Sequence, residues 1–121
     1  MRSLGAAILL LTSLAGCGER VSGEAFQSFD LGASRLQLRA SAGWAFSSHV
    51  VHVYEMRGDR SWFMGSMELA NDGAVLGEGN AELVPVGEGE WDLRLSGQEQ
   101  PEQVWRVERA GARLTLTPPQ G

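Results

Sequence analysis

The chain has 121 residues, and its ten arginines, absent lysines and 15 acidic residues give a net charge of −5. This acidic balance argues against nucleic-acid binding and against a basic membrane-surface patch. A single cysteine excludes an intrachain disulfide, and the length suits one ordinary domain with its own apolar core.

The N-terminal segment has the layout of a secretory signal. Met1 and Arg2 give it a positively charged start, residues 4–11 (LGAAILLL) are apolar, and small residues follow. A spanning helix needs about 20 apolar residues, so this run is too short to remain as a transmembrane segment. The segment ends at the cysteine, in the sequence Leu14-Ala15-Gly16-Cys17.

The sequence LAGC resembles the lipobox of bacterial lipoproteins, and it matches at every lipobox position. The resemblance implies that the Cys17 sulfur receives a diacylglyceryl group, that cleavage makes Cys17 the mature N-terminus, and that its amine is acylated. Gly18 stands where the inner-membrane retention signal of that family has Asp, which favours the outer membrane in a cell with two membranes. An ordinary signal followed by a chance cysteine is the alternative.

Cleavage before Cys17 divides the chain into four parts. Loss of residues 1–16, the signal peptide, leaves 105 residues with a net charge of −6. Residues 17–25 are polar and contain glycine, so we expect a lipidated tether there. Residues 26–117 form the predicted β domain, and 118–121 form a tail, because consecutive prolines cannot join a sheet.

Short alternating runs, separated by glycine-containing turns, predict an all-β domain. A period of two is typical of strands that bury one face. The expected strands cover 26–31, 34–40, 47–57, 61–70, 75–84, 91–96, 104–107 and 114–117. Short connections favour a single small antiparallel meander of about eight strands, closed into a barrel or a barrel-like sandwich. No helix is expected beyond the signal.

The aromatic side chains are the candidate binding residues. The segments 47–57 and 61–70 are apolar on both faces, so they are predicted to be central strands. Strict alternation puts Trp62 and Met64 on one face of the second segment, with Phe63, Met67 and Leu69 on the other. An apolar face left uncovered would mark a partner or ligand site; burial in the core is the alternative. The candidates are Trp62, Met64, Tyr54 and Trp105.

No residue set predicts catalysis, a metal or a cofactor. His49 and His52 are three residues apart, so on a strand they point to opposite faces and cannot share a metal. The acidic stretch 77–92 lacks the ligand spacing of a calcium loop. Ser47 and Ser48 have no nucleophile signature around them.

These observations predict a non-catalytic lipoprotein of the cell envelope, facing the periplasm if the cell is Gram-negative. Its small β domain would bind another envelope protein or a ligand, with no nucleic-acid partner. The first alternative is a lipocalin-like carrier of a small apolar molecule, because Gly89–Trp91 resembles the lipocalin Gly-x-Trp motif. The second is a lysozyme-inhibitor-like protein, since an acidic domain suits a basic enzyme, although the cysteine pair usual in those inhibitors is absent. A passive structural role is the third.

Overall fold

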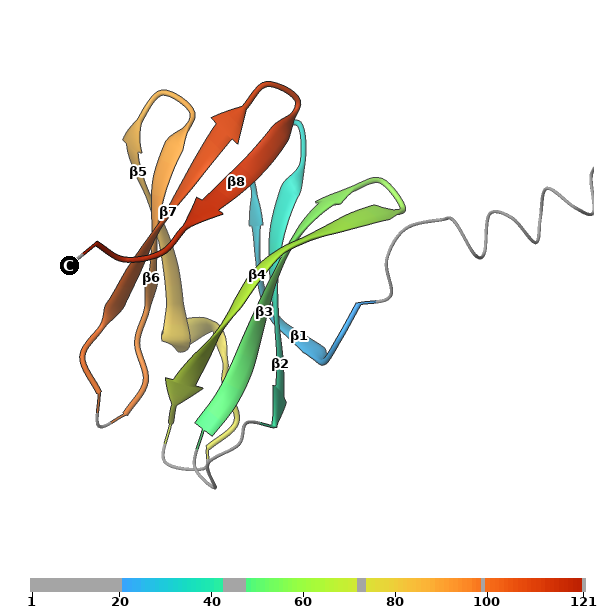
Figure 1. The fold of residues 1–121 in the computed structure, drawn as a ribbon. Helices are drawn as coiled ribbons and strands as arrows, with labels where there is room; N and C mark the ends of the chain where they lie inside the picture. Colours follow the sequence, from blue (N-terminus) through green and yellow to red (C-terminus); the bar gives the residue numbers. More distant parts are fainter. Residues whose placement is uncertain (1–20, 43–47, 72–73, 99, 121) are drawn as a thin grey trace, which may run out of the picture.

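A computed structural model describes residues 21–42, 48–71, 74–98 and 100–120, which form a sandwich of two antiparallel sheets (Figure 1). The first sheet has the order β1-β2-β3-β4 and the second β5-β6-β7-β8. A short 3-10 helix, η1, precedes the second sheet. The bounds are β1 Glu24–Asp30, β2 Arg35–Ala42, β3 Ser48–Arg57, β4 Arg60–Ala70, η1 Glu78–Asn80, β5 Ala81–Gly87, β6 Glu90–Leu95, β7 Gln103–Ala110 and β8 Arg113–Thr117.

The prediction of an all-β meander of eight strands is confirmed, in its sandwich form. Each strand pairs with its neighbour in sequence, and the described strands form no ladder between the two sheets. The predicted hairpin turns form around Gly58, Gly89 and Gly111, which all have positive φ. Glycine adopts that conformation without steric cost, so these residues end one strand and start the next within two positions.

Alternation along each strand directs apolar side chains into the space between the sheets. In β2, Leu36 and Leu38 are fully buried, whereas Arg35 remains exposed. The second sheet contributes its own inward residues in the same way. The fully buried apolar side chains are Leu36, Leu38, Val51, Val53, Leu69, Leu93, Leu95 and Val107. These side chains fill the interior and hold the two sheets together.

Two expected boundaries were wrong. The strand expected at 75–84 begins only at Ala81, because Asn80 closes a 3-10 turn before it: its carboxamide accepts a hydrogen bond from the Gly77 amide and donates one to the Ser96 carbonyl. At the other end, β1 begins at Glu24 and so includes the last two residues of the expected tether. In both places local polar contacts, which alternation does not encode, decide where the strand starts.

Glutamine side chains cover the free edge of β4. The Gln103 side chain donates a hydrogen bond to the Glu68 carbonyl, and the Gln100 carboxamide oxygen accepts one from the Ala70 amide. Both glutamines belong to the second sheet or the loop before β7, so they also fasten one sheet to the other. An uncovered edge strand is a template for aggregation, and these contacts occupy part of that edge.

We expect Leu93→Ala to lower the free energy of unfolding by about 2–5 kcal/mol, because it leaves a cavity in the interior. The control is Val86→Ala, since Val86 is 46% exposed and its truncation should cost under about 0.5 kcal/mol. Urea unfolding followed by tryptophan fluorescence measures both. Equal losses would contradict the assignment of the core.

Candidate functional site

A β-bulge in β4 changes which of its side chains face inward. Val53 pairs with Gly65 and Tyr54 with Phe63, which leaves Met64 without a partner on β3. Beyond the bulge the alternation is shifted by one residue, so Trp62 shares the inward side with Met67. The expectation that Trp62 and Met64 form one face, with Phe63 on the face of Met67, was therefore wrong. Met64 is half-buried and packs against the core.

Tyr54 is enclosed on the outer face of the first sheet. Its ring is 3% exposed and meets Phe63 edge to face, with 5.5 Å between the ring centroids. Its hydroxyl accepts a hydrogen bond of 3.0 Å from the Ser22 amide. Tyr54 was predicted as a partner-binding residue, but it has no free surface to offer, because the chain entering β1 lies over it.

A buried carboxylate connects the two sheets at the end where the β3–β4 and β7–β8 hairpins turn. The Glu55 side chain is fully buried on the inner side of β3. Its Oε1 accepts hydrogen bonds from Arg113 Nε at 3.0 Å and from the Leu114 amide at 3.1 Å. Its Oε2 is 3.3 Å from Arg57 Nη2, which also donates to the Ala112 carbonyl at 2.8 Å. One carboxylate thus joins β3 to the β7–β8 hairpin.

Glu55 stays ionised despite its burial. Burial by itself raises the pKa of a carboxyl group. The hydrogen bonds from the Leu114 amide and the Arg113 side chain, together with the positive charge of Arg113, outweigh that effect and hold the pKa of Glu55 below its ordinary value of 4.5. The site therefore works as a charged connection between the sheets at neutral pH.

Trp62 lies in this cluster and is not an isolated apolar patch. The Arg113 guanidinium lies over its ring, 4.3 Å from the centroid, and that of Arg60 is 5.1 Å away. Cation–π contacts of this kind contribute about 0.5–1 kcal/mol at exposed sites. Trp62 is half-buried, and its two arginine contacts connect the β4 hairpin with β8.

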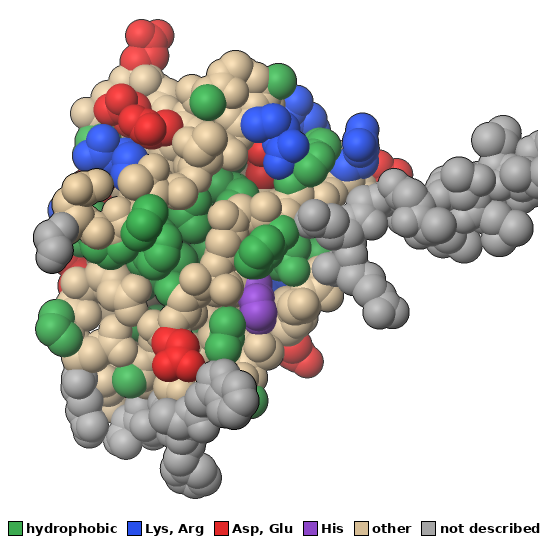
Figure 2. Space-filling view, in the orientation of Figure 1, with side chains coloured by type: hydrophobic (Ala, Val, Ile, Leu, Met, Phe, Trp, Pro, Cys, Tyr) green, Lys and Arg blue, Asp and Glu red, His purple; other side chains and the backbone are tan. Residues whose placement is uncertain are grey.

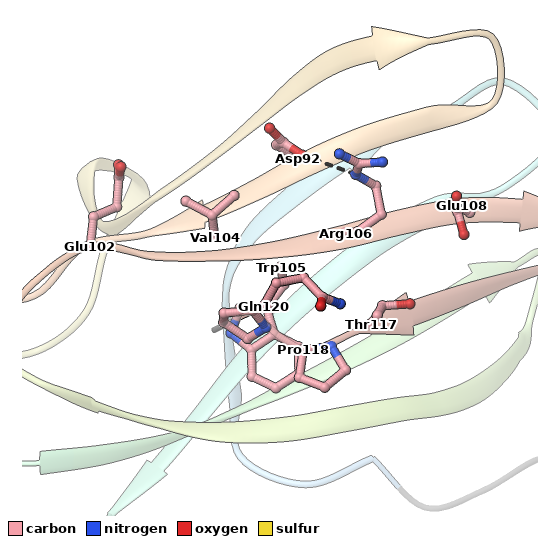
Figure 3. Close-up of a pocket in the computed structure, with 10 residues that line it drawn as sticks. Asp92, Glu102, Val104, Trp105, Arg106, Glu108, Thr117, Pro118 and Gln120 are labelled. Atoms are coloured by element: carbon pink, nitrogen blue, oxygen red, sulfur yellow. Dashed lines mark hydrogen bonds and ion pairs between the residues drawn. The ribbon is translucent and has the colours of Figure 1, made fainter.

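Trp105 borders a groove on the surface of the protein, as Figure 3 shows. The groove has a volume of about 610 Å³ and runs along β7 and the residues that follow β8. The Trp105 ring packs partly against the core, and its indole nitrogen donates to the Gln103 side chain at 3.0 Å. Pro118 and Gln120 lie beside the ring, whereas Val104 and Arg106 lie on the other side of β7 (Figure 3). An aromatic ring and a proline thus form part of the apolar lining of this groove.

Carboxylates outnumber cations around this groove. Three acidic side chains line it, namely Asp92, Glu102 and Glu108, against one arginine, Arg106. Arg106 Nε is 3.1 Å from an Asp92 oxygen, so this arginine is already paired within the groove. The Glu102 side chain is 44% exposed and pairs with Arg94, and Glu108 forms no salt bridge with any residue that the structure describes. The groove therefore presents negative potential to a ligand.

A second, smaller hollow lies at the opposite end of the first sheet from Glu55. Its volume is about 320 Å³, and its lining is mostly apolar: Glu24, Ala25, Phe26, Ala40, Ser41, Ala42, His49, Val75 and Leu76. Ala42, in its lining, is the last described residue before the undescribed range 43–47. It has no cluster of charged or hydrogen-bonding groups comparable to the Trp105 groove.

The two histidines diverge, as predicted from their spacing. His49 Nε2 is 2.8 Å from the Ala74 carbonyl, whereas His52 Nε2 is 2.8 Å from the Ser41 hydroxyl on the outer face of the first sheet. Burial, and then the neighbouring charge of Arg39, lower the pKa of His52. Within the described ranges, no group of His, Cys, Asp or Glu side chains is arranged to hold a metal ion, and no helix is long and apolar enough to cross a membrane.

Cys17, with the rest of residues 1–20, lies outside the described residues. Comparison of the chain with protein-family models, with curated proteins and with solved structures found no match. The function is therefore argued from the chain's own residues.

The Glu55 cluster was not predicted from the sequence. Glu55 and Arg113 are 58 residues apart, and both fall in alternating strands where a charged residue is typical of a solvated face. The one available signal was the apolar setting of Glu55, between Tyr54 and Met56 in a strand predicted to be central. The acidic lining of the Trp105 groove could be found only with the register of β6 and β7 known.

We expect Glu55→Gln to lower the free energy of unfolding at pH 7 by about 1.5–3 kcal/mol, the contribution of hydrogen bonds to a charged group. The side chains of its partners Arg57 and Arg113 are 38% and 43% exposed. In the variant, water therefore replaces part of the hydrogen bonding that these arginines lose. Glu102→Gln, which breaks an exposed pair, should cost less than about 1 kcal/mol. Urea titration measures both variants.

The loss in Glu55→Gln should also depend on pH. Because folding lowers the pKa of Glu55, its ionised form stabilises the fold fully above the ordinary value of 4.5, and that contribution disappears as the pH falls through the lower folded-state pKa. The difference in unfolding free energy between wild type and Glu55→Gln should therefore shrink on acidification. A constant difference from pH 7 to pH 3 would contradict the ionised assignment.

Proposed function

We propose that this chain is a bacterial lipoprotein, anchored in the cell envelope through lipid on Cys17, whose β domain binds a protein partner without catalysis. In a Gram-negative cell, Gly18 after the cysteine favours the outer membrane with the domain in the periplasm. The observation that carries the binding proposal is the groove of about 610 Å³ beside Trp105. An aromatic ring with polar side chains around it fits the pattern of protein-binding surfaces, which have a core enriched in aromatic residues and a polar rim.

The chemistry of the groove favours a basic segment of the partner. An apolar side chain of that segment would pack on Trp105 and Pro118, and Arg or Lys side chains would pair with Glu102 and Glu108. Tryptophan is prominent among the residues that dominate binding energy at interfaces. The net charge of −6 expected for the mature chain would speed the association with a basic protein.

The carrier alternative receives less support than the binding module. Eight fully buried apolar side chains occupy the space between the sheets, whereas a carrier of a small apolar molecule needs an interior left open for it. The second hollow, about 320 Å³ in volume, lies at the surface. A lysozyme-inhibitor-like role falls within the favoured class, because lysozyme would be a basic partner.

We expect Cys17→Ser to release the protein from membranes, because the lipid is the proposed attachment. Expressed in a bacterium that processes lipoproteins, the wild-type chain should sediment with membranes and should be extracted by detergent. The variant should appear in the soluble fraction or keep its uncleaved signal. If Cys17→Ser is cleaved normally and still sediments with membranes, lipid anchoring is wrong.

We expect a photo-crosslinking residue at Val104, in the groove, to capture a partner in cells. The control places the same residue at Val86, another strand valine, which is 46% exposed whereas Val104 is half-buried, and which lies outside the groove. The Val104 adduct should weaken at least about tenfold on Glu108→Arg, and its captured peptide should be basic. Equal adducts at both positions, or none at Val104, would contradict the groove as the binding site.

A further inference from the structure

The residues that enter β1 are held against the outer face of the first sheet. The Arg39 guanidinium donates to the carbonyl of Ser22 at 3.1 Å and to that of Gly23 at 2.7 and 3.2 Å. The Ser22 amide donates to the hydroxyl of the buried Tyr54 at 3.0 Å. Four hydrogen bonds therefore fix the direction in which the chain reaches the domain.

Gly23 makes this arrangement possible. Its φ is +76°, and a Cβ at this position would lie 2.5 Å from the Ala40 carbonyl oxygen. Only glycine accepts both the left-handed conformation and the close approach to β2. Gly23 thus helps to fix the path by which the chain enters β1.

Apolar side chains lie exposed beside this entry point. Val21 is 38% exposed and Phe63 is 48% exposed, and these are two of the four large hydrophobic residues that the described chain leaves exposed. Both adjoin Tyr54: Phe63 meets its ring edge to face, and Val21 precedes the serine whose amide is hydrogen-bonded to its hydroxyl. Part of the exposed apolar surface therefore lies where the chain enters the domain.

Three arginines surround the same end of the sandwich. Arg57 and Arg60 flank the β3–β4 turn, three residues from Tyr54 and Phe63 respectively, and Arg113 starts β8. Figure 2 shows basic side chains gathered at this end. The strand register also places Arg35 and the exposed Asp30 at this end, beside the buried Glu55 and the exposed Asp59. Among these groups four arginines face three carboxylates, so the first sheet and Arg113 together carry a small positive excess at this end although the whole chain is acidic. Composition had argued against a basic membrane-surface patch, but it does not reveal such local clustering.

The proposed lipid must lie close to this surface. Three residues lie between Cys17 and Val21, which makes four steps along the backbone, and a fully extended chain of four steps spans at most about 14 Å. The lipid on Cys17 therefore cannot reach a membrane far from Val21, Phe63 and the β3–β4 turn.

We infer that Val21, Phe63, Arg57, Arg60 and Arg113 form a membrane-facing surface that contacts anionic phospholipid head groups. This inference rests on the proposed lipid at Cys17. Phe63 and Val21 would enter the interfacial region, and the guanidiniums would donate hydrogen bonds to lipid phosphates. Figure 1 shows that the chain enters on the side of the first sheet and that the C-terminal residues bordering the Trp105 groove lie on the side of the second sheet. The groove is thereby turned away from the membrane.

The test places a fluorescent label at one of two matched turns in the full, lipidated chain. Asp59 and Glu88 are both exposed turn residues beside a glycine of positive φ, and a cysteine at either position is the only free thiol once Cys17 is lipidated. Each labelled protein is reconstituted into vesicles of phosphatidylcholine and phosphatidylglycerol, 3:1, with a nitroxide on part of the head groups. We expect quenching of the label in Asp59→Cys to be at least twofold stronger than in Glu88→Cys.

Arg60→Glu added to Asp59→Cys tests the charge contribution. Arg60 makes no salt bridge in the described structure and contacts only Trp62 among the ring contacts, so the fold should tolerate the change. Quenching of the label in the double variant should fall toward that in Glu88→Cys. Quenching in Asp59→Cys, with Arg60 unchanged, should fall by the same amount in vesicles of phosphatidylcholine alone.

The outcomes separate the two proposals. Intact mass of each reconstituted sample reports lipid on Cys17, and a chain without lipid would overturn both anchoring and orientation. A lipidated chain with equal quenching at both turns would overturn the membrane-facing surface and leave the anchor standing. Quenching at Asp59→Cys that is unchanged by Arg60→Glu and by phosphatidylcholine vesicles would overturn the contact with anionic head groups.

Discussion

Apolar contact between the two sheets is the constraint on which the rest of the structure depends. The described strands pair only within their own sheet, and the chain's single cysteine allows no internal disulfide. The sheets are held together by the fully buried residues of their inner faces, and burial of each such side chain contributes about 1.5–3 kcal/mol. With the interior filled in this way, binding has to take place on the outside of the sandwich.

Polar contacts between the sheets decide how the outside is arranged. Glu55 attaches the β7–β8 hairpin to β3 and gathers Arg57 and Arg113 at one end. Arg39 and Tyr54 bring the start of the domain to the outer face of the first sheet. The Trp105 groove then lies on the other sheet. The proposed anchor and the groove thus lie on separate sheets, which supports the proposal of a membrane-held protein whose binding surface faces the periplasm.

Alternation in the sequence was sufficient to predict the fold class. In a strand with one buried face, the apolar side chains recur at every second residue, as Leu36 and Leu38 do. It failed at β4, where the bulge at Met64 moves Trp62 and Phe63 to the opposite faces from those expected. It failed at Tyr54 as well, since the covering residues come from 32 positions earlier in the chain. The position of a bulge, a contact between the two sheets and the path by which the chain enters the domain all depend on residues distant in sequence. A period of two within one strand therefore carries no information about them. Trp105, a predicted binding residue, is half-buried and borders the groove, but its acidic surroundings were not foreseen.

The central claim is that a lipid-anchored chain carries a protein partner, and native mass spectrometry of the full-length protein, extracted gently from its own membrane, tests it most directly. The account predicts a chain that begins at a lipidated Cys17 and is accompanied by one basic protein, with that companion lost from Glu108→Arg while the lipid mass remains. An unlipidated chain, or a lipidated chain accompanied by a small apolar molecule in place of a protein, would contradict the account.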